Sequence, residues 1–217
     1  IVRLVGSEMC IRDRLKDNLE KTLKQNNYSK EIWVFAYGAL MWAPCFEPEV
    51  TLSSTLKGWA RKPCLWTLTA RGSKQKPGVV FALDKAQRKY CHGLIFRISQ
   101  SRLETDLLNL WRREMSVGLY KPTWLPVEAG TKKIMALCFV VNRHHKLFIK
   151  CVSKHDLIYA IANARGEYGT CLDYYQKTLD SLNKLGLEDN YIHKLVTAAV
   201  LKSVSYTHLR AHETYDH

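Results

Sequence analysis

The sequence predicts an α+β fold in which a small mixed β-barrel is flanked by helices. Short apolar or alternating segments dominate residues 32–141, and glycine or proline separates many of them. After residue 153 the apolar residues recur at spacings of three and four, which is the period of an amphipathic helix. About six or seven short strands followed by helices are typical of α+β domains whose strands curl into a barrel.

The 217 residues are enough for one domain with a sizeable core, and we assign residues 15–203 to it. Residues 1–14 and 204–217 resemble sequencing-adapter read-through at the edges of translated assemblies. We therefore set both aside as non-native tails and expect them to be disordered.

Composition restricts the partners. The net charge of +13 suits a polyanion, but Lys and Arg are dispersed without a basic block of five, so we expect no nucleic acid. No apolar run approaches the ~20 residues of a membrane span, so we expect no membrane either. Seven cysteines without a C-x-x-C pair favour a reduced, cytoplasmic protein. The oligomeric state stays open.

The first expected elements are one helix and the strands of the barrel. Leu15, Leu19 and Leu23 recur every four residues, which predicts an amphipathic helix from residue 14 to about residue 26, without a role in chemistry. Strands are expected at residues 32–35, 50–56, 64–69, 79–83, 90–98, 124–127 and 133–141.

Glycine and proline mark the expected breaks. Gly58-Trp59 and Lys62-Pro63 should end the second strand, and Arg71–Gly78 reads as a turn-rich polar loop. Gly93 lies inside a strand and indicates a bulge or a tight bend.

Three helices are expected near the C-terminus. Ser153 and Asp156 form the S-x-x-D pattern of a capping box before the first one. Residues 172–182 form the second, which Gly186 can terminate, and residues 192–199 form the third.

The segment 31–44, EIWVFAYGALMWAP, carries a candidate binding feature. Its apolar run ends at Tyr37-Gly38-Ala39, which indicates a buried strand that leads into a tight glycine turn. Gly38 has no side chain, so a ligand can approach the main chain, and backbone N–H groups of such a turn suit a carboxylate or a developing oxyanion. The alternative is an ordinary turn after a strand.

A carboxylate on an apolar helix face is the second candidate. Leu103, Leu107, Leu110 and Trp111 define an apolar stripe, and at about 100° per residue Glu114 returns to the middle of it. Burial raises the pKa of a carboxyl, and such groups cluster at functional sites. The alternative is that the helix frays by Arg113 and that Glu114 only pairs with Arg112 or Arg97.

Other residue clusters are weaker candidates. Cys91 and His92 are adjacent on a predicted strand, so their side chains point to opposite faces and cannot form a nucleophilic pair. His144 and His145 are expected in an exposed turn, because no further ligand lies at metal-binding spacing. The six Trp residues are expected in the core or in a pocket wall rather than on a nucleic-acid stacking platform.

Several separated motifs resemble the ChaC family of gamma-glutamylcyclotransferases. The loop VFAYGALMW at residues 34–42 is similar to the family's V-F-G-Y-G-S-L-x-W pattern, and residues 113–120 are similar to its R-E-M/K…G-x-Y segment. The similarity continues through Gly58-Trp59, Pro77-Gly78 and residues 169–174, and it covers roughly Trp33 to Leu201.

The resemblance implies the family's compact mixed barrel and its chemistry. Glutathione would be cyclised to 5-oxoproline with release of cysteinylglycine, and the reaction requires no metal, nucleotide or covalent intermediate. The resemblance assigns Glu114 as the acid/base and Tyr120 and Tyr174 as partners of the substrate's polar end. The gamma-glutamyl binding loop would comprise Val34, Phe35, Ala36, Tyr37, Gly38, Ala39 and Leu40.

The chain departs from the family pattern at two loop positions. Ala36 replaces a glycine, and Ala39 replaces a serine, so one side-chain hydrogen bond to the substrate is expected to be lost while the backbone donors remain. A catalytically weak gamma-glutamyl-binding module, a basic RNA-associated protein and a cyclotransferase for other gamma-glutamyl amines stay open as alternatives.

Overall fold

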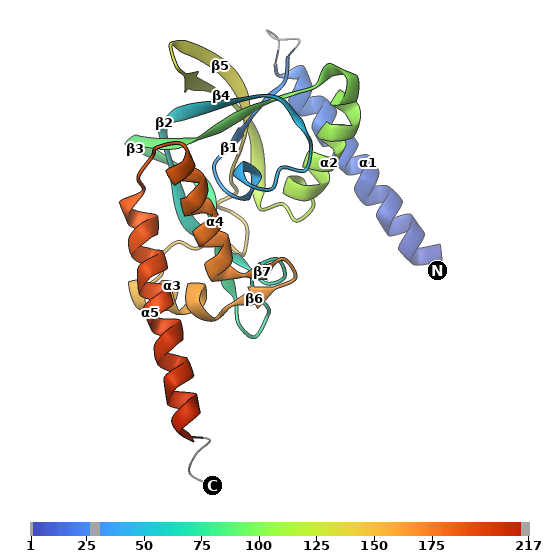
Figure 1. The fold of residues 1–217 in the computed structure, drawn as a ribbon. Helices are drawn as coiled ribbons and strands as arrows, with labels where there is room; N and C mark the ends of the chain where they lie inside the picture. Colours follow the sequence, from blue (N-terminus) through green and yellow to red (C-terminus); the bar gives the residue numbers. More distant parts are fainter. Residues whose placement is uncertain (1, 27–30, 214–217) are drawn as a thin grey trace. The chain divides into compact units, whose positions relative to one another are not determined.

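The structure is a computed structural model with an α+β architecture, as the sequence predicts (Figure 1). It describes the backbone of residues 2–26 and 31–213 and the side chains of residues 13–26 and 31–203. The chain forms two compact units, residues 1–61 with 82–146 and residues 62–81 with 147–217.

The first unit holds a closed β-barrel with the strand order β1-β3-β2-β4-β5. The strands are β1 (Trp33–Ala36), β2 (Pro48–Thr67), β3 (Gly78–Ile98), β4 (Tyr120–Ala129) and β5 (Lys132–Val141). Residues 62–67 of β2 and 78–81 of β3 belong to the second unit. A closed barrel leaves no strand edge unpaired, and the short apolar segments of the sequence supply its interior.

Strand β1 is the central element for the site. It runs antiparallel to β3, with Trp33 opposite Arg97 and Ala36 opposite Leu94, and it has a parallel bridge to β5 at Val34. All four residues of β1 are buried, as a strand covered on both faces requires. The apolar run that predicts this strand is therefore confirmed.

Two predicted breaks in the barrel strands are wrong. Strand β2 continues through Gly58 and Pro63, and β3 runs without interruption from Gly78 to Ile98. Gly58 is accommodated within the strand by a positive φ of 80°, and Arg88 in β3 has a φ of 61°. These residues bend long strands instead of ending them, because pairing with neighbouring strands outweighs the local break signal.

Gly93 is explained by a close backbone approach. A Cβ atom at this position would lie 2.2 Å from the carbonyl oxygen of Ala36 on the neighbouring strand. Only glycine therefore allows β3 to pass this end of β1.

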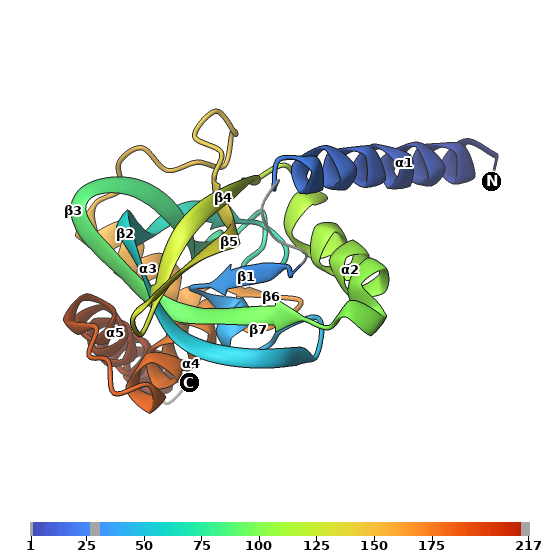
Figure 2. The ribbon, with the colours of Figure 1, turned by 90° about the horizontal axis from the view of Figure 1, so that it is seen from above.

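The β4–β5 hairpin and two helices complete the first unit. Helices α1 (Val2–Lys24) and α2 (Leu103–Met115) lie side by side in Figure 2. The indole of Trp111 in α2 donates a hydrogen bond of 3.0 Å to the side chain of Asn18 in α1. Trp111 also packs edge-to-face on Phe139 of β5, with ring centroids 5.6 Å apart. Trp111 thus fixes the position of α2 on the barrel.

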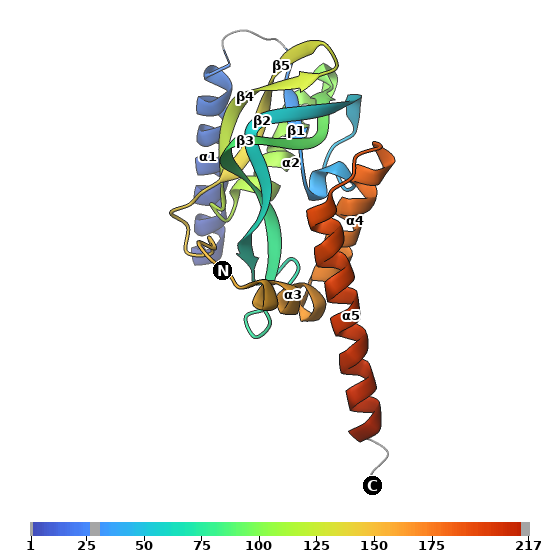
Figure 3. The same cartoon turned by 90° about the vertical axis from the view of Figure 1, so that its left-hand side faces the viewer.

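The second unit contains the three predicted C-terminal helices, α3 (Lys154–Asn163), α4 (Cys171–Lys184) and α5 (Asn190–Glu213), which pack together (Figure 3). The capping box is confirmed, because the Ser153 hydroxyl accepts a hydrogen bond of 3.0 Å from the Asp156 amide. Gly186, with a φ of 70°, follows the end of α4 as predicted. A short ladder of β6 (Arg165–Gly166) and β7 (Gly169–Thr170) precedes α4.

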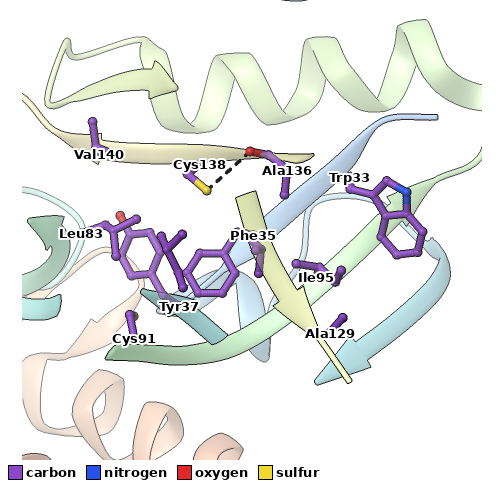
Figure 4. Packing of buried hydrophobic residues seen from close by; sticks show 12 residues of the cluster. Trp33, Phe35, Tyr37, Leu83, Cys91, Ile95, Ala129, Ala136, Cys138 and Val140 are labelled. Carbon is purple, nitrogen blue, oxygen red and sulfur yellow. Dashed lines mark hydrogen bonds between the residues drawn. The ribbon is translucent and has the colours of Figure 1, made fainter. Parts of the chain in front are cut away.

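The side chains of the barrel interior alternate along β1. Trp33, Phe35 and Tyr37 belong to one buried cluster with residues from the other barrel strands (Figure 4). The Phe35 and Tyr37 rings have centroids 6.1 Å apart. The side chains of alternate residues along this segment therefore belong to the barrel core.

The two terminal segments are helical in backbone, since α1 begins at Val2 and α5 extends to Glu213. The side chains of residues 1–12 and 204–217 lie outside the described residues. The assignment of both ends as non-native tails around a domain at residues 15–203 therefore stays a prediction. Within the described part of the chain, no helix combines the length and apolarity needed to cross a bilayer.

Candidate active site

Glu114 lies in the last turn of α2 and continues its buried stripe. Leu107, Leu110 and Trp111 are each at most 2% exposed, Leu103 is half-buried, and the side chain of Glu114 is 14% exposed. The helix is intact to Met115, so the alternative of a frayed end is wrong. The predicted return of Glu114 to the apolar side of the helix is confirmed.

The environment of Glu114 alters its acidity. Burial raises the pKa of its carboxyl from 4.5 to about 6, while the neighbouring Arg113 opposes this shift. The Arg113 Nε atom lies 3.3 Å from the Glu114 Oε1 atom. The ion pair is thus formed with Arg113, not with Arg112 or Arg97. A pKa of about 6 suits a group that exchanges protons near neutral pH.

A chain of hydrogen bonds connects this carboxylate to the glycine turn. The guanidinium of Arg113 donates to the carbonyl oxygen of Ala43. The amide of Ala43 in turn donates to the carbonyl oxygen of Ala39 over 2.8 Å. Cys45, two residues further on, has its pKa raised mainly by burial, and Glu114 adds to this effect while Arg113 opposes it. The end of α2 therefore lies against the segment that directly follows the turn.

The turn itself is a single turn of 3-10 helix, η1 (Ala39–Met41). The amides of Met41 and Trp42 donate to the carbonyl oxygens of Gly38 and Ala39 over 2.9 and 3.2 Å. The N–H groups of Ala39 and Leu40 come before these bonds and have no acceptor within the turn itself, as at the start of any helix. Their predicted role as donors to a ligand stays a prediction.

The loop residues differ in what they can offer. Gly38 has a φ of −139°, so it does not use the left-handed region, and its contribution is the absence of a side chain. The side chains of Phe35 and Tyr37 lie in the barrel core, and the Tyr37 hydroxyl donates a hydrogen bond of 2.7 Å to the Phe139 carbonyl. From Ile32 to Leu40, only Ala39 is not fully buried.

Tyr120 begins β4, directly after the loop that follows α2, and it is half-buried opposite Val141. The loop is held from β5, because the Asn142 amide donates to the Leu119 carbonyl over 2.8 Å. The Asn142 side chain also donates to the Gly118 carbonyl over 3.1 Å. Glu114 and Tyr120 therefore stand at the two ends of one short, fixed connection.

Tyr174 belongs to the second unit, in α4, and is 5% exposed. Its hydroxyl accepts a hydrogen bond of 3.1 Å from the Phe81 amide, and its ring packs on Phe81 and Tyr175. The guanidinium of Arg71 lies 5.8 Å from the ring centroid and forms an ion pair of 3.1 Å with Asp173. Within its own unit Tyr174 thus has a packing role.

The side chains of Cys91 and His92 are arranged as expected. Cys91 is buried in the barrel while His92 is exposed and bonds to Thr55, so the two side chains point to opposite faces. His144 and His145 lie in a turn closed by a bond from the His145 amide to the Asn142 carbonyl. Among residues 13–26 and 31–203, no group of three or more His, Cys, Asp or Glu is arranged to hold a metal ion.

Sequence reasoning missed Arg61 and the contact of Arg113 with the loop. The Arg61 guanidinium donates to the carbonyl oxygens of Tyr37 and His92. For Arg61 the sequence offers only a weak signal, which is an arginine two residues after the Gly58-Trp59 pair. Hydrogen bonds to main-chain carbonyls far away in the sequence leave no local pattern.

Comparison with known proteins identifies the family. Residues 32–202 match the profile of the family described as ChaC-like protein. The chain belongs to this family. The ChaC-like chain is 32% identical over 168 residues to the glutathione-specific gamma-glutamylcyclotransferase of Escherichia coli. This alignment covers 77% of this chain and 72% of the Escherichia coli protein. It is 24% identical over 172 residues to the human glutathione-specific gamma-glutamylcyclotransferase 1, covering 77% and 78% of the two chains.

A solved structure supports the same fold for the ChaC-like chain. The crystal structure of a yeast gamma-glutamyl cyclotransferase specific to glutathione superposes with a TM-score of 0.72 at 16% sequence identity. The superposition covers 81% of this chain and 97% of the yeast chain. The predicted mixed barrel with flanking helices is confirmed by this likeness.

Proposed function

We propose that this chain is a gamma-glutamylcyclotransferase that converts glutathione into 5-oxoproline and cysteinylglycine. Membership of the ChaC-like family supports the proposal, and relatives that cover about three quarters of the chain carry names specific to glutathione. The reaction is an intramolecular cyclisation, so the substrate supplies both the nucleophile and the leaving group.

Ring closure needs a bent substrate. In a gamma-glutamyl amide the alpha-amine attacks the side-chain carbonyl carbon and closes a five-membered lactam. The new C–N bond forms in a tetrahedral intermediate, and the C–N bond to the cysteine nitrogen then breaks. Holding the two reacting atoms together within one site provides a large effective molarity.

Glu114 is assigned the proton transfers. With a pKa of about 6 its carboxyl is mostly ionised at pH 7, so it can accept a proton from the attacking amine. The same proton can then pass to the leaving nitrogen, after which Glu114 is again a carboxylate. Atoms and charges therefore balance without a metal or a covalent enzyme intermediate.

The glycine turn is assigned the oxyanion. The N–H groups near Gly38, Ala39 and Leu40 are held by η1, and rigid donors of this type stabilise a developing negative charge. Loss of one such donor typically costs about 3 to 4 kcal/mol of transition-state stabilisation. The buried side chains of Phe35 and Tyr37 fix the strand that presents these donors.

The remaining assignments rest on the family pattern. Tyr120 is assigned to the polar end of the substrate, since it begins β4 six residues after Glu114 and is not fully buried. Tyr174 is the weaker of the two, because its hydroxyl already accepts the bond from Phe81. Ala36 and Ala39 replace the family's glycine and serine, so we expect weaker binding than in a chain that retains both.

One observation carries the proposal: a buried carboxylate of raised pKa is joined through Arg113 and Ala43 to the backbone of the glycine turn. The test is to incubate the purified chain with glutathione and to quantify 5-oxoproline and cysteinylglycine. Glu114→Gln should lower the rate of formation of both products by about 10²- to 10⁴-fold while the protein remains folded. Glu104→Gln is the matched control, because Glu104 is exposed on the same helix.

The outcomes separate the alternatives. Equal amounts of both products from the parent chain, formed at least about 100-fold more slowly by the Glu114 variant, support the cyclotransferase. No product from a folded parent chain favours a binding module that retains the gamma-glutamyl site. Faster turnover of other gamma-glutamyl amines than of glutathione, measured side by side, would change the substrate and keep the chemistry.

The compartment is part of the same proposal. Cys45, Cys64, Cys91, Cys138, Cys151 and Cys171 are free thiols, which is the usual state in a reducing compartment such as the cytoplasm. Glutathione is itself the main thiol there, so substrate and compartment agree. Measuring the activity in a cytoplasmic fraction against a secreted fraction would test this assignment.

A further inference from the structure

Arg61 links two strands next to the glycine turn. It lies in the part of β2 that belongs to the first unit, and its side chain is only partly exposed. Its Nε atom donates to the carbonyl oxygen of Tyr37, and its Nη2 atom donates to the carbonyl oxygen of His92. A guanidinium offers several donors in one rigid plane, so a single side chain can hold both carbonyls.

The bond to Tyr37 fixes the direction of the next peptide. The described residues contain no cis peptide bond, so the carbonyl of Tyr37 and the N–H of Gly38 point in opposite directions across one planar group. Because the carbonyl is turned toward Arg61, the N–H of Gly38 is turned away from Arg61. A positive charge at the carbonyl oxygen also polarises the peptide and makes its N–H a stronger donor.

Other contacts fix the residues on either side of the Tyr37–Gly38 peptide. The hydroxyl of Tyr37 is bonded to the Phe139 carbonyl over 2.7 Å, which holds the ring in the barrel. Ala36 is held by strand pairing with Leu94 and by the close approach of Gly93. On the other side, η1 closes with the bond from Met41 to Gly38. Between these fixed points, the guanidinium of Arg61 binds the carbonyl oxygen of the Tyr37–Gly38 peptide.

We propose that Arg61 is a positioning residue that orients and polarises the Gly38 N–H as a donor to the oxyanion of the cyclisation. This inference rests on the proposed function, because it assigns the donor to that reaction. In this proposal Arg61 acts on the reaction only through the Tyr37–Gly38 peptide group. The effect should therefore appear in turnover more than in substrate binding, since the oxyanion exists only along the reaction path.

The test compares Arg61→Ala and Arg61→Lys with a matched control. Removing a donor from an oxyanion site lowers kcat by about 10²- to 10³-fold, and loss of a residue that only orients the donor should cost less. We expect Arg61→Ala to lower kcat by about 10- to 100-fold with KM changed by less than about threefold. Arg61→Lys should recover part of kcat, because one ammonium replaces the charge but not the planar pair of donors.

Chemical rescue distinguishes positioning from general damage. Millimolar guanidinium should restore part of kcat to Arg61→Ala and should leave the parent chain unchanged. Arg97→Ala is the control, since Arg97 is an arginine of the same barrel that pairs with Glu31 and Glu49 at 2.8 and 3.3 Å. Its kcat should stay within about twofold of the parent and should not respond to guanidinium.

Several results would overturn the inference. One is a folded Arg61→Ala variant with kcat within twofold of the parent, and another is a variant whose loss lies entirely in KM. If Arg61→Ala does not fold, a fully active Arg61→Lys variant with an unchanged kcat would overturn the inference as well. An inactive parent chain would instead contradict the proposed function, so the two failures can be distinguished.

Discussion

The pH dependence of turnover provides a sharp prediction, because Arg113 and burial act in opposite directions on the pKa of Glu114. In the proposed reaction the carboxylate must be ionised to accept the first proton. Activity of the parent chain should therefore fall as the pH decreases through about 6, the pKa of this carboxyl in the folded protein. A carboxyl with the ordinary pKa of 4.5 would place this fall in activity at a correspondingly lower pH.

Removing the charge of Arg113 should move this transition upward. Two unit charges 3.3 Å apart interact by about 1.3 kcal/mol even at the dielectric constant of water, which corresponds to about one pKa unit. Arg113→Gln should thus shift the acidic limb of kcat/KM to higher pH by on the order of one unit. The sign follows because the guanidinium favours the ionised carboxylate, and its loss favours the protonated form.

The assay is the rate of 5-oxoproline formation from glutathione between pH 4.5 and 8. Arg113 also donates to Ala43, so its loss can lower the plateau as well, but only the charge moves the position of the limb. Arg113→Lys should restore the position. Arg112→Gln is the control, because Arg112 is exposed and does not contribute to the pKa shift of Glu114. An unchanged limb in Arg113→Gln, or a shift to lower pH, would refute the reasoning.

Three further predictions concern stability and binding. Because burial raises the folded pKa of Glu114, its ionised carboxylate destabilises the native state as the pH rises from about 4.5 through 6. The unfolding free energy of Glu114→Gln should therefore increase by about 2 kcal/mol relative to that of the parent between pH 4 and pH 8. Urea denaturation at the two pH values measures this difference. Ala39→Ser should lower KM, since Ala39 is the partly exposed loop position where the family has serine; an unchanged or raised KM removes the idea. Tyr37→Phe should lower unfolding free energy by about 1 to 3 kcal/mol, because the Phe139 carbonyl loses its donor, while kcat changes little.

The sequence predicts well those features that depend on local periodicity. The apolar stripe through Leu107, Leu110 and Trp111 places Glu114 on the buried side of α2, and the structure agrees. The capping box at Ser153 is also local, and it forms as expected. Such patterns can be recognised in a sequence because residues on one helix face share the same environment and therefore the same polarity.

Features that depend on distant pairing are not predictable in the same way. Gly58 reads as a strand break, yet β2 continues because the neighbouring strands supply the hydrogen bonds and a positive φ absorbs the irregularity. The Arg61 bonds to Tyr37 and His92 join residues 24 and 31 positions apart in the sequence. The fold creates these contacts, so no spacing rule predicts them.

The same limit applies to the loop. The sequence indicates a glycine turn after a buried strand, and η1 follows Gly38 in the structure. It does not reveal that the side chains of Trp33, Phe35 and Tyr37 fill the barrel. Closure of the barrel decides this point, because the interior face exists only when all five strands are in place.

A comparison of substrate binding with turnover in Glu114→Gln decides whether this carboxylate transfers the protons. We predict that this variant binds glutathione with a Kd within about threefold of the parent, measured by calorimetry, because the amide retains the shape of the side chain. Its kcat should fall by about 10²- to 10⁴-fold, the usual contribution of a general acid–base group. A folded Glu114→Gln variant that retains kcat within tenfold of the parent would contradict the account.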